Sequence, residues 1–118
     1  MLFLSRLLNW RPWRAAERVV FDQHAISHTP RRGAVTRFDW ADLDAIDIET
    51  TDQGPFVDDV FWLLSGPKGL CRISNAAEGM QALRQALQAL PGFDHDVAIM
   101  AMAMAANARF PCWRRAEP

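Results

Sequence analysis

The sequence of 118 residues has no tyrosine, only two cysteines and a formal net charge of −1. So small a net charge gives no general attraction to nucleic acid or to acidic lipid. Cys71 and Cys112 are too few and too far apart to indicate a disulfide framework or a zinc site, so we expect reduced thiols and a cytoplasmic protein. The apolar stretch 1–10 is interrupted by Arg6, lacks the features of a secretory signal and is too short to span a bilayer.

Motifs that carry catalytic chemistry are also missing. The glycines belong to turns and form no phosphate-binding loop, and no serine lies in a nucleophile elbow. Cys71 is expected to act as a small hydrophobe in a strand, and Cys112 to be the more exposed thiol. His24 and His28 are four residues apart, but the segment does not have the helical pattern or the glutamate of zinc hydrolases, so both are expected to be surface histidines. We therefore expect no enzyme, no cofactor and no metal site.

What the sequence does contain is apolar material for one core. Half of the residues are hydrophobic, and five Trp and seven Phe add large apolar area to a short chain. There is no internal repeat and no low-complexity linker. We expect an N-terminal amphipathic segment at residues 1–18 and a single α+β domain at residues 19–118.

Apolar patterning and turn residues place the strands in the first two thirds of the chain. Short strands are predicted at 19–21, 26–29, 35–40, 45–51, 60–64 and 70–73, of which about five are well marked. In the fourth, Ile46 and Ile48 alternate with Asp47 and Glu49, which predicts one buried and one acidic face. The turn at 65–69 predicts an antiparallel hairpin.

Two helices are predicted to follow the strands. Asn75 and Glu78 have the spacing of a helix cap, and apolar residues then recur at helical spacing from Met80 to Leu90. Asp94 is expected to cap a second helix that runs to about Ala108. Its expected apolar side carries Val97, Met100, Met104 and Ala108.

The predicted fold is an antiparallel sheet curled as a barrel or roll and covered by one or two C-terminal helices. The predicted core residues are Trp40, Leu43, Ile46, Ile48, Phe61, Leu63, Leu83 and Leu87.

Several segments together resemble a known family. Phe38-Asp39-Trp40-Ala41-Asp42-Leu43 runs into Ile46-Asp47-Ile48, Thr50-Thr51-Asp52-Gln53-Gly54-Pro55-Phe56 precedes Asp59-Val60-Phe61-Trp62, and Leu90-Pro91-Gly92-Phe93-Asp94 follows. This ordered set, over residues 19–113, resembles the bacterial pleckstrin-homology-like domains, and more narrowly a group of short uncharacterised bacterial proteins. The resemblance implies a barrel of seven strands with one closing helix, whereas about five strands and two helices are evident here. The basic phosphoinositide pocket of eukaryotic members has no counterpart, so no ligand is implied.

Charge is distributed in blocks. Residues 39–59 carry eight carboxylates and no basic residue, whereas residues 1–37 carry seven arginines. The loop 50–59 is the main candidate site, through Thr51, Asp52, Gln53, Asp58 and Asp59. Its oxygens could bind a cation, face a partner or make turn hydrogen bonds within the loop.

The N-terminal segment is a second candidate surface. Leu4, Leu7, Trp10 and Trp13 lie close to several arginines, a composition that suits a membrane interface, a second subunit or packing on the chain's own sheet.

From these features we expect a non-catalytic protein-interaction module. Its acidic face and 50–59 loop would meet a basic partner protein, or the arginine-rich N-terminal segment of a second copy. One alternative is a protein held at the inner membrane surface by its N-terminal segment, and another is a small-ligand binder or motif-free enzyme. The acidic middle of the chain disfavours nucleic acid, and no small-molecule partner is predicted.

Overall fold

The computed structural model describes residues 16–54 and 58–117. These residues form seven strands, two α-helices and one short 3-10 turn. The strands are β1 (Arg18–Phe21), β2 (Ala25–Thr29), β3 (Thr36–Asp39), β4 (Ala45–Thr50), β5 (Val60–Gly66), β6 (Gly69–Ser74) and β7 (Ala108–Arg114). The helices are α2 (Met80–Gln88) and α3 (His95–Met102), and the 3-10 turn is η1 (Trp40–Asp42).

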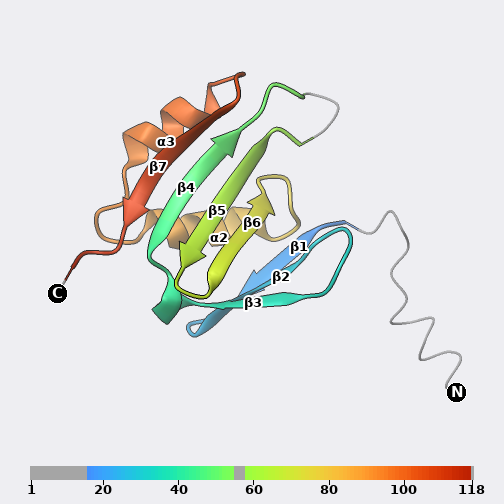
Figure 1. Cartoon of the computed structure of the whole chain (residues 1–118), viewed down its shortest axis with the longest axis vertical. Helices are drawn as coiled ribbons and strands as arrows, with labels where there is room; N and C mark the ends of the chain where they lie inside the picture. The colour runs from blue at the N-terminus through green and yellow to red at the C-terminus, as the bar shows by residue number, and fades with distance from the viewer. Residues whose placement is uncertain (1–15, 55–57, 118) are drawn as a thin grey trace, which may run out of the picture.

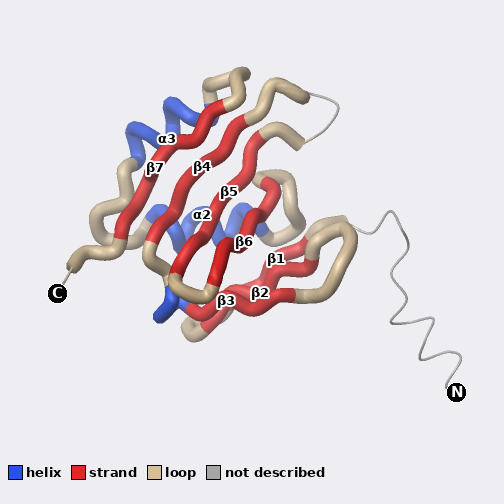
Figure 2. The backbone as a smooth tube through the Cα atoms, viewed as in Figure 1, coloured by secondary structure: helices blue, strands red, loops and turns tan. Residues whose placement is uncertain are grey.

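The strands form two antiparallel sheets, one of order β1-β2-β3 and one of order β6-β5-β4-β7. Figure 1 shows both helices behind the four-stranded sheet, whose front face is open to the viewer. Figure 2 shows the three-stranded sheet beside the β6 end of the larger one. The α+β class is confirmed. The strands described here do not close into the expected barrel, because no ladder joins the two sheets.

The face of the four-stranded sheet that meets the helices is built from rows of paired apolar residues. Trp62 of β5 lies between Ile48 and Ile73, and the next row joins Ile46, Leu64 and Cys71. Directly paired residues of antiparallel strands project to the same face. With Leu83 and Leu87 of α2 they form a single buried core, which confirms Leu43, Ile46, Ile48, Leu83 and Leu87 as core residues.

In β5 the prediction of a buried Leu63 is confirmed, whereas the prediction of a buried Phe61 was wrong, and the row facing the helices is Trp62 and Leu64. Phe61 pairs with Glu49, and Leu63 pairs with Asp47 and Arg72, so both lie on the open face. Leu63 is buried there, and Phe61 is half-buried. Trp40, also expected in the core, is half-buried at its margin. Because side chains alternate along a strand, a shift of one residue moves every side chain to the other face.

The second helix is shorter than predicted, and the end of the chain, for which no element was predicted, forms a strand. The second helix ends at Met102, and residues 108–114 pair with β4 as the edge strand β7. Pro111 is tolerated there because an edge strand needs hydrogen bonds on one side only. The register shifts by one residue opposite Ile46 and Asp47. This bulge turns Trp113 toward the core and returns Arg114 to the open face.

The two helices differ from expectation in their caps and faces. Helix α2 is preceded by Gly79 at φ 87°, and Asn75 instead accepts hydrogen bonds from the Trp62 indole (3.0 Å) and the Arg84 guanidinium (2.7 Å). Asp94 caps α3 as predicted, because its carboxylate accepts the Val97 N–H at 3.0 Å. The buried residues of α3 are Ala98 and Ala101, whereas Met100 and Met104, expected to pack inward, are exposed.

Glu17 and β1 are bonded to the segment that follows β6, which joins the small sheet to the rest of the fold. Val19 N–H donates to the Glu78 carbonyl at 2.9 Å, and Glu78 N–H donates to the Glu17 carbonyl at 2.9 Å. Val19 and Ile26 lie in the same core as Trp62 and Leu83. The two sheets therefore belong to one folded unit that already includes Glu17. Within the described ranges, no helix has the length and apolar character needed to cross a bilayer.

Candidate functional site

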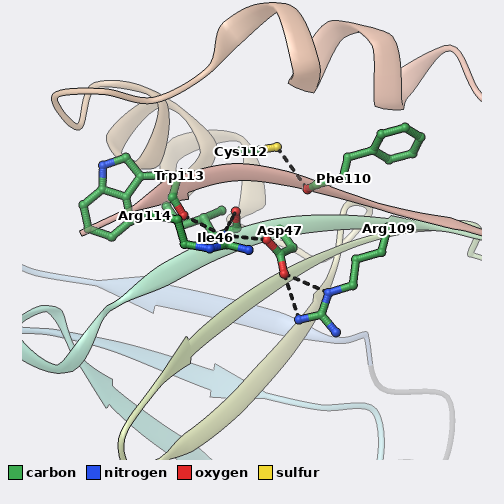
Figure 3. Close-up of polar contacts among 7 residues, drawn as sticks. All are labelled: Ile46, Asp47, Arg109, Phe110, Cys112, Trp113 and Arg114. Carbon is green, nitrogen blue, oxygen red and sulfur yellow. Dashed lines mark hydrogen bonds and ion pairs between the residues drawn. The ribbon is translucent and has the colours of Figure 1, made fainter. Parts of the chain in front are cut away.

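Asp47 lies at the centre of the open face of the four-stranded sheet, and its side chain is only 5% exposed. Arg109 donates to one carboxylate oxygen through both Nε and Nη2, each at 2.8 Å. Arg114 donates to the other oxygen at 2.8 Å. Figure 3 shows the two guanidinium groups reaching the carboxylate from β7. Asp47 is therefore a fully engaged anion held by a fork of two arginines.

Glu49, the next outward carboxylate of β4, is paired in the same way. Arg72 of β6 donates to it at 2.8 Å, and the Arg72 guanidinium carbon lies 3.5 Å from the centroid of the Phe61 ring. Three arginines thus face two carboxylates. The acidic flank that was expected to remain free for a partner is neutralised by the chain's own side chains. The sequence pattern did not indicate these ion pairs, because Arg109 and Arg114 lie in a segment that was not recognised as a strand.

The 50–59 loop makes several internal hydrogen bonds. Thr51 N–H donates to the Asp59 carbonyl at 2.8 Å, the Thr51 hydroxyl accepts the Gln53 N–H at 3.5 Å, and Asp52 N–H donates to Asn107 at 3.3 Å. Asp52 and Gln53 are exposed, and Asp58 is half-buried. Among described residues, no three acidic, histidine or cysteine side chains form a metal-binding group. A partner-binding role for this loop stays a prediction.

The second candidate surface lies outside the described residues. Leu4, Leu7, Trp10 and Trp13 belong to residues 1–15, so their contact with a membrane, a second subunit or the domain itself stays a prediction.

A cavity of about 350 Å³ lies between β3 and the start of β6. Its lining combines two basic, two acidic and five uncharged residues: Thr36, Arg37, Phe38, Asp39, Asp42, Lys68, Gly69, Leu70 and Cys71. Two ion pairs cross its rim, Arg37–Asp39 at 2.9 Å and Lys68–Asp42 at 3.3 Å. The cavity was not foreseen, because it depends on how the two sheets meet.

Next to the cavity, β6 is the outer strand of its sheet. Backbone groups of an antiparallel edge strand point alternately toward the neighbouring strand and away from it. Ser74 N–H points away from β5, because it donates to the Glu17 carboxylate at 2.9 Å. By the same alternation, the N–H and C=O groups of Leu70 and Arg72 also point away from the sheet.

Glu17 and His28 form a second unexpected group, across the β1–β2 pair. The His28 ring nitrogen Nε2 lies 2.6 Å from the Glu17 carboxylate, and His28 is 7% exposed, so the prediction of a surface histidine was wrong. Burial alone would lower the pKa of His28. Side-chain hydrogen bonds to Cys71 and to Glu17, with their charges, raise this pKa to about 9.

Cys71 lies in β6 as part of the buried core, as predicted, whereas Cys112 differs from expectation. Both are free, and Cys112, expected to be the more accessible, is 2% exposed. Burial, with the nearby Asp47 charge, raises the pKa of the Cys112 thiol to about 11. Cys71, in contrast, lines the cavity.

Comparison with protein-family models, with curated proteins and with solved structures finds no match to this chain. The comparisons therefore assign neither a family nor an activity.

Proposed function

We propose that the chain is a non-catalytic protein-interaction module that binds an extended peptide segment of a partner protein along the free edge of β6. The observation that carries this proposal is the outward-pointing backbone of Leu70 and Arg72 beside the cavity between β3 and β6. An exposed strand edge is a template for one more strand, and many peptide-binding domains use it in this way.

The backbone supports an added strand over the first part of β6. Gly66 and Gly69 are paired across the two-residue turn, so the outward positions are Leu70, Arg72 and Ser74. The Glu17 carboxylate already accepts the outward N–H of Ser74. A bound peptide of about four to six residues could then pair with Leu70 and Arg72, whose N–H and C=O groups give four backbone hydrogen-bonding positions.

Side chains near this edge offer specificity. Alternate side chains of an added strand would point toward the cavity and toward the open face. On the cavity side they would meet Phe38 and the ion-paired Arg37 and Lys68. On the open face they would meet Leu70, which is 58% exposed. A peptide with one apolar side chain flanked by polar ones fits this surface better than a uniformly charged one.

The geometry favours this edge over the acidic face. Asp47 and Glu49 are already bound by arginines, so a basic partner would have to displace them. The 50–59 loop lies at the opposite end of β5 from the turn that leads into β6. The two sites can therefore be tested separately.

A peptide-selection experiment tests the edge directly. A random twelve-residue phage-displayed library is panned on the full-length protein, and selected peptides are measured by fluorescence anisotropy. Leu70→Pro removes one outward N–H without removing a ladder hydrogen bond, and Leu70→Ala is the matched control that keeps the N–H. We expect Leu70→Pro to weaken binding at least about tenfold relative to Leu70→Ala, because a peptide carbonyl loses its donor.

The variant Asp52→Asn/Asp58→Asn/Asp59→Asn serves as a second control. It should bind the selected peptides like wild type if the edge is the site. Equal binding by the two Leu70 variants, loss of binding in the loop variant, or a library that yields no binder would each overturn the proposal. Thermal melting of every variant checks that it is folded.

The proposal includes two further features. Two free cysteines support a cytoplasmic location, where thiols stay reduced. Seven strands in two sheets support a relationship to pleckstrin-homology-like domains, although here both helices precede the final strand.

A further inference from the structure

We propose that the peptide bound at β6 pairs at the same time with β3, so that it lies as one strand between the two sheets and joins them. This inference rests on the proposed peptide binding and adds a second edge to it. The joined sheet has the order β1-β2-β3-peptide-β6-β5-β4-β7. The partner that fits is an extended segment without proline in its centre, because both sides of its backbone are hydrogen-bonded.

The cavity between β3 and β6 follows the outer edges of both strands. Its lining includes the whole of β3 and residues 69–71 of β6, and it includes none of the described residues of β1, β2, β4 or β5. Among the described strands, β3 pairs only with β2, and β6 pairs only with β5. The cavity therefore lies at the place where each of the two sheets ends.

Two residues of β3 direct their backbone hydrogen-bonding groups away from β2. Trp40 N–H donates to the His24 carbonyl at 3.0 Å, so this pair belongs to the hydrogen-bonded positions of the ladder. Alternation then directs the backbone of Phe38 toward β2 and the backbones of Arg37 and Asp39 away from it. Among residues 16–54 and 58–117, no backbone group accepts from or donates to these outward groups.

On the other side of the cavity, β6 presents the outward backbones of Leu70 and Arg72. Two strand edges with unpaired backbone groups thus border one groove. A strand placed between them lies about 4.8 Å from each. Along such a strand, one residue directs its N–H and C=O to β6, and the next directs them to β3. Every central N–H of the peptide is therefore a donor to one of the two edges.

The side chains of the groove select an apolar residue at the centre of the peptide. Phe38 pairs with Ile26, and Cys71 pairs with Leu64, so both side chains lie on the faces that point to the core. An inward side chain of the peptide meets Phe38 and Cys71, whereas its neighbours point outward beside the exposed Leu70. The cavity of about 350 Å³ is near the lower end of the range for ligand sites.

The groove has two defined ends. Figure 2 shows the turn between β5 and β6 beside the end of β3, and a Cβ added to Gly66 would overlap the Asp42 carbonyl oxygen there. Lys68 forms an ion pair with Asp42 at 3.3 Å at the same end. At the far end of β6, the Glu17 carboxylate accepts the Ser74 N–H. About four residues of an added strand, or about 13 Å, lie between these limits.

A matched pair of variants tests the β3 edge. Arg37→Pro removes one outward N–H without removing a β2–β3 ladder hydrogen bond, and Arg37→Ala loses the same side chain but keeps the N–H. The probe is the tightest of the phage-selected twelve-residue peptides. We expect Arg37→Pro to bind it at least about fivefold more weakly than Arg37→Ala, and thermal melting checks that both are folded.

An N-methyl scan of the same peptide needs only the wild-type protein. Each N-methyl group removes one backbone donor of the peptide and leaves its side chain in place. We expect at least about fivefold weaker binding at each of several consecutive central positions, as measured by fluorescence anisotropy. Losses at every second position only would show a strand on β6 alone. That result would overturn the second edge and leave the proposed function intact.

Amide hydrogen exchange, measured residue by residue by NMR, locates the two edges directly. Saturating peptide should slow exchange at Arg37 and Asp39 at least about tenfold, as it does at Leu70 and Arg72. Phe38, already bonded to β2, is the internal control and should change less. Slowing confined to Leu70 and Arg72, or equal binding by the two Arg37 variants, would overturn this inference alone. The absence of slowing at all four residues would overturn the proposed function as well.

Discussion

At Asp47, two half-exposed guanidinium groups hold a carboxylate that has almost no contact with water. The side chains of Arg109 and Arg114 are each 55% exposed, whereas that of Asp47 is 5% exposed. Asp47 therefore depends on the two arginines more than the arginines depend on Asp47. The arginines can be solvated without Asp47, but Asp47 cannot be solvated without rearranging the face.

This asymmetry predicts unequal effects of substitution. Asp47→Asn should lower the free energy of unfolding by about 1–2 kcal/mol, because charge-assisted hydrogen bonds are weakened but no charge is buried alone. The double variant Arg109→Met/Arg114→Met should lower it by about 3 kcal/mol or more, because it leaves an uncompensated buried carboxylate. Urea denaturation measures both. A larger loss in Asp47→Asn than in the double variant would contradict this account.

His28 makes stability depend on pH in the alkaline direction. Its pKa in the folded protein is about 9, above the ordinary 6.5. A raised histidine pKa contributes stability that is fully present below pH 6.5 and is lost as pH rises through 9. We expect the free energy of unfolding to fall by about 2–3 kcal/mol between pH 6.5 and pH 9.5. His28→Gln should remove most of this decline, and an equal decline in that variant would assign it to other groups.

The residue contacts at His28 show a limit of sequence interpretation. His24 and His28 have no helical context, and nothing near them in the chain announces a buried ion pair. Glu17 reaches His28 across the β1–β2 pair, and the Ser74 N–H of the larger sheet joins the same carboxylate. One of the two helix caps could be predicted from the sequence. Asp94 is a typical capping residue and was predicted, whereas Gly79 begins α2 through a left-handed backbone conformation that composition does not reveal.

Helix α2 depends on a glycine at its start. Gly79 has a φ of 87°, and a Cβ added there would lie within van der Waals overlap of the Val19 carbonyl oxygen. Gly92 has nearly the same φ, 85°, but nothing lies within 4 Å of an added Cβ. The two glycines share the backbone conformation, but only at Gly79 would an added Cβ meet a neighbouring atom.

Alanine at these two positions separates the two effects. Gly92→Ala should lower the free energy of unfolding by about 1–2 kcal/mol, the usual loss for a non-glycine residue in the left-handed region. Gly79→Ala should lower it by more than twice as much, because either β1 or the start of α2 must move. Thermal melting checks both, and similar losses would show that the contact with Val19 relaxes freely.

At the scale of elements, most strands could be predicted and some faces could not. In β5 the run Phe61-Trp62-Leu63-Leu64 is apolar on both faces, so alternation does not identify the inner one. In α3 the buried residues are the small Ala98 and Ala101, which permit close packing, and the larger Ile99 and Met100 are exposed. Pro111 obscured β7, because proline is tolerated in edge strands but rarely marks one.

At the scale of the whole molecule, the antiparallel α+β class followed from the order of apolar segments. The separation into two sheets did not, because sheet closure depends on which strand edges meet. One core nevertheless spans both sheets: Val19 and Ile26 from the smaller sheet pack with Trp62, Leu64 and Leu83. Among residues 16–54 and 58–117, the buried apolar residues form this one cluster and give neither sheet a core of its own.

The shared core predicts that the described domain unfolds in one cooperative step. Ile26 is fully buried, so Ile26→Ala should lower the free energy of unfolding by about 2–4 kcal/mol. Val20, on the same small sheet, is 58% exposed, and Val20→Ala should change it by less than about 0.5 kcal/mol. In Ile26→Ala, near-UV circular dichroism, which is sensitive to the buried Trp62, and far-UV circular dichroism should shift together. A transition that splits in two, with the near-UV signal unchanged in midpoint, would mean that the small sheet detaches before the rest of the fold.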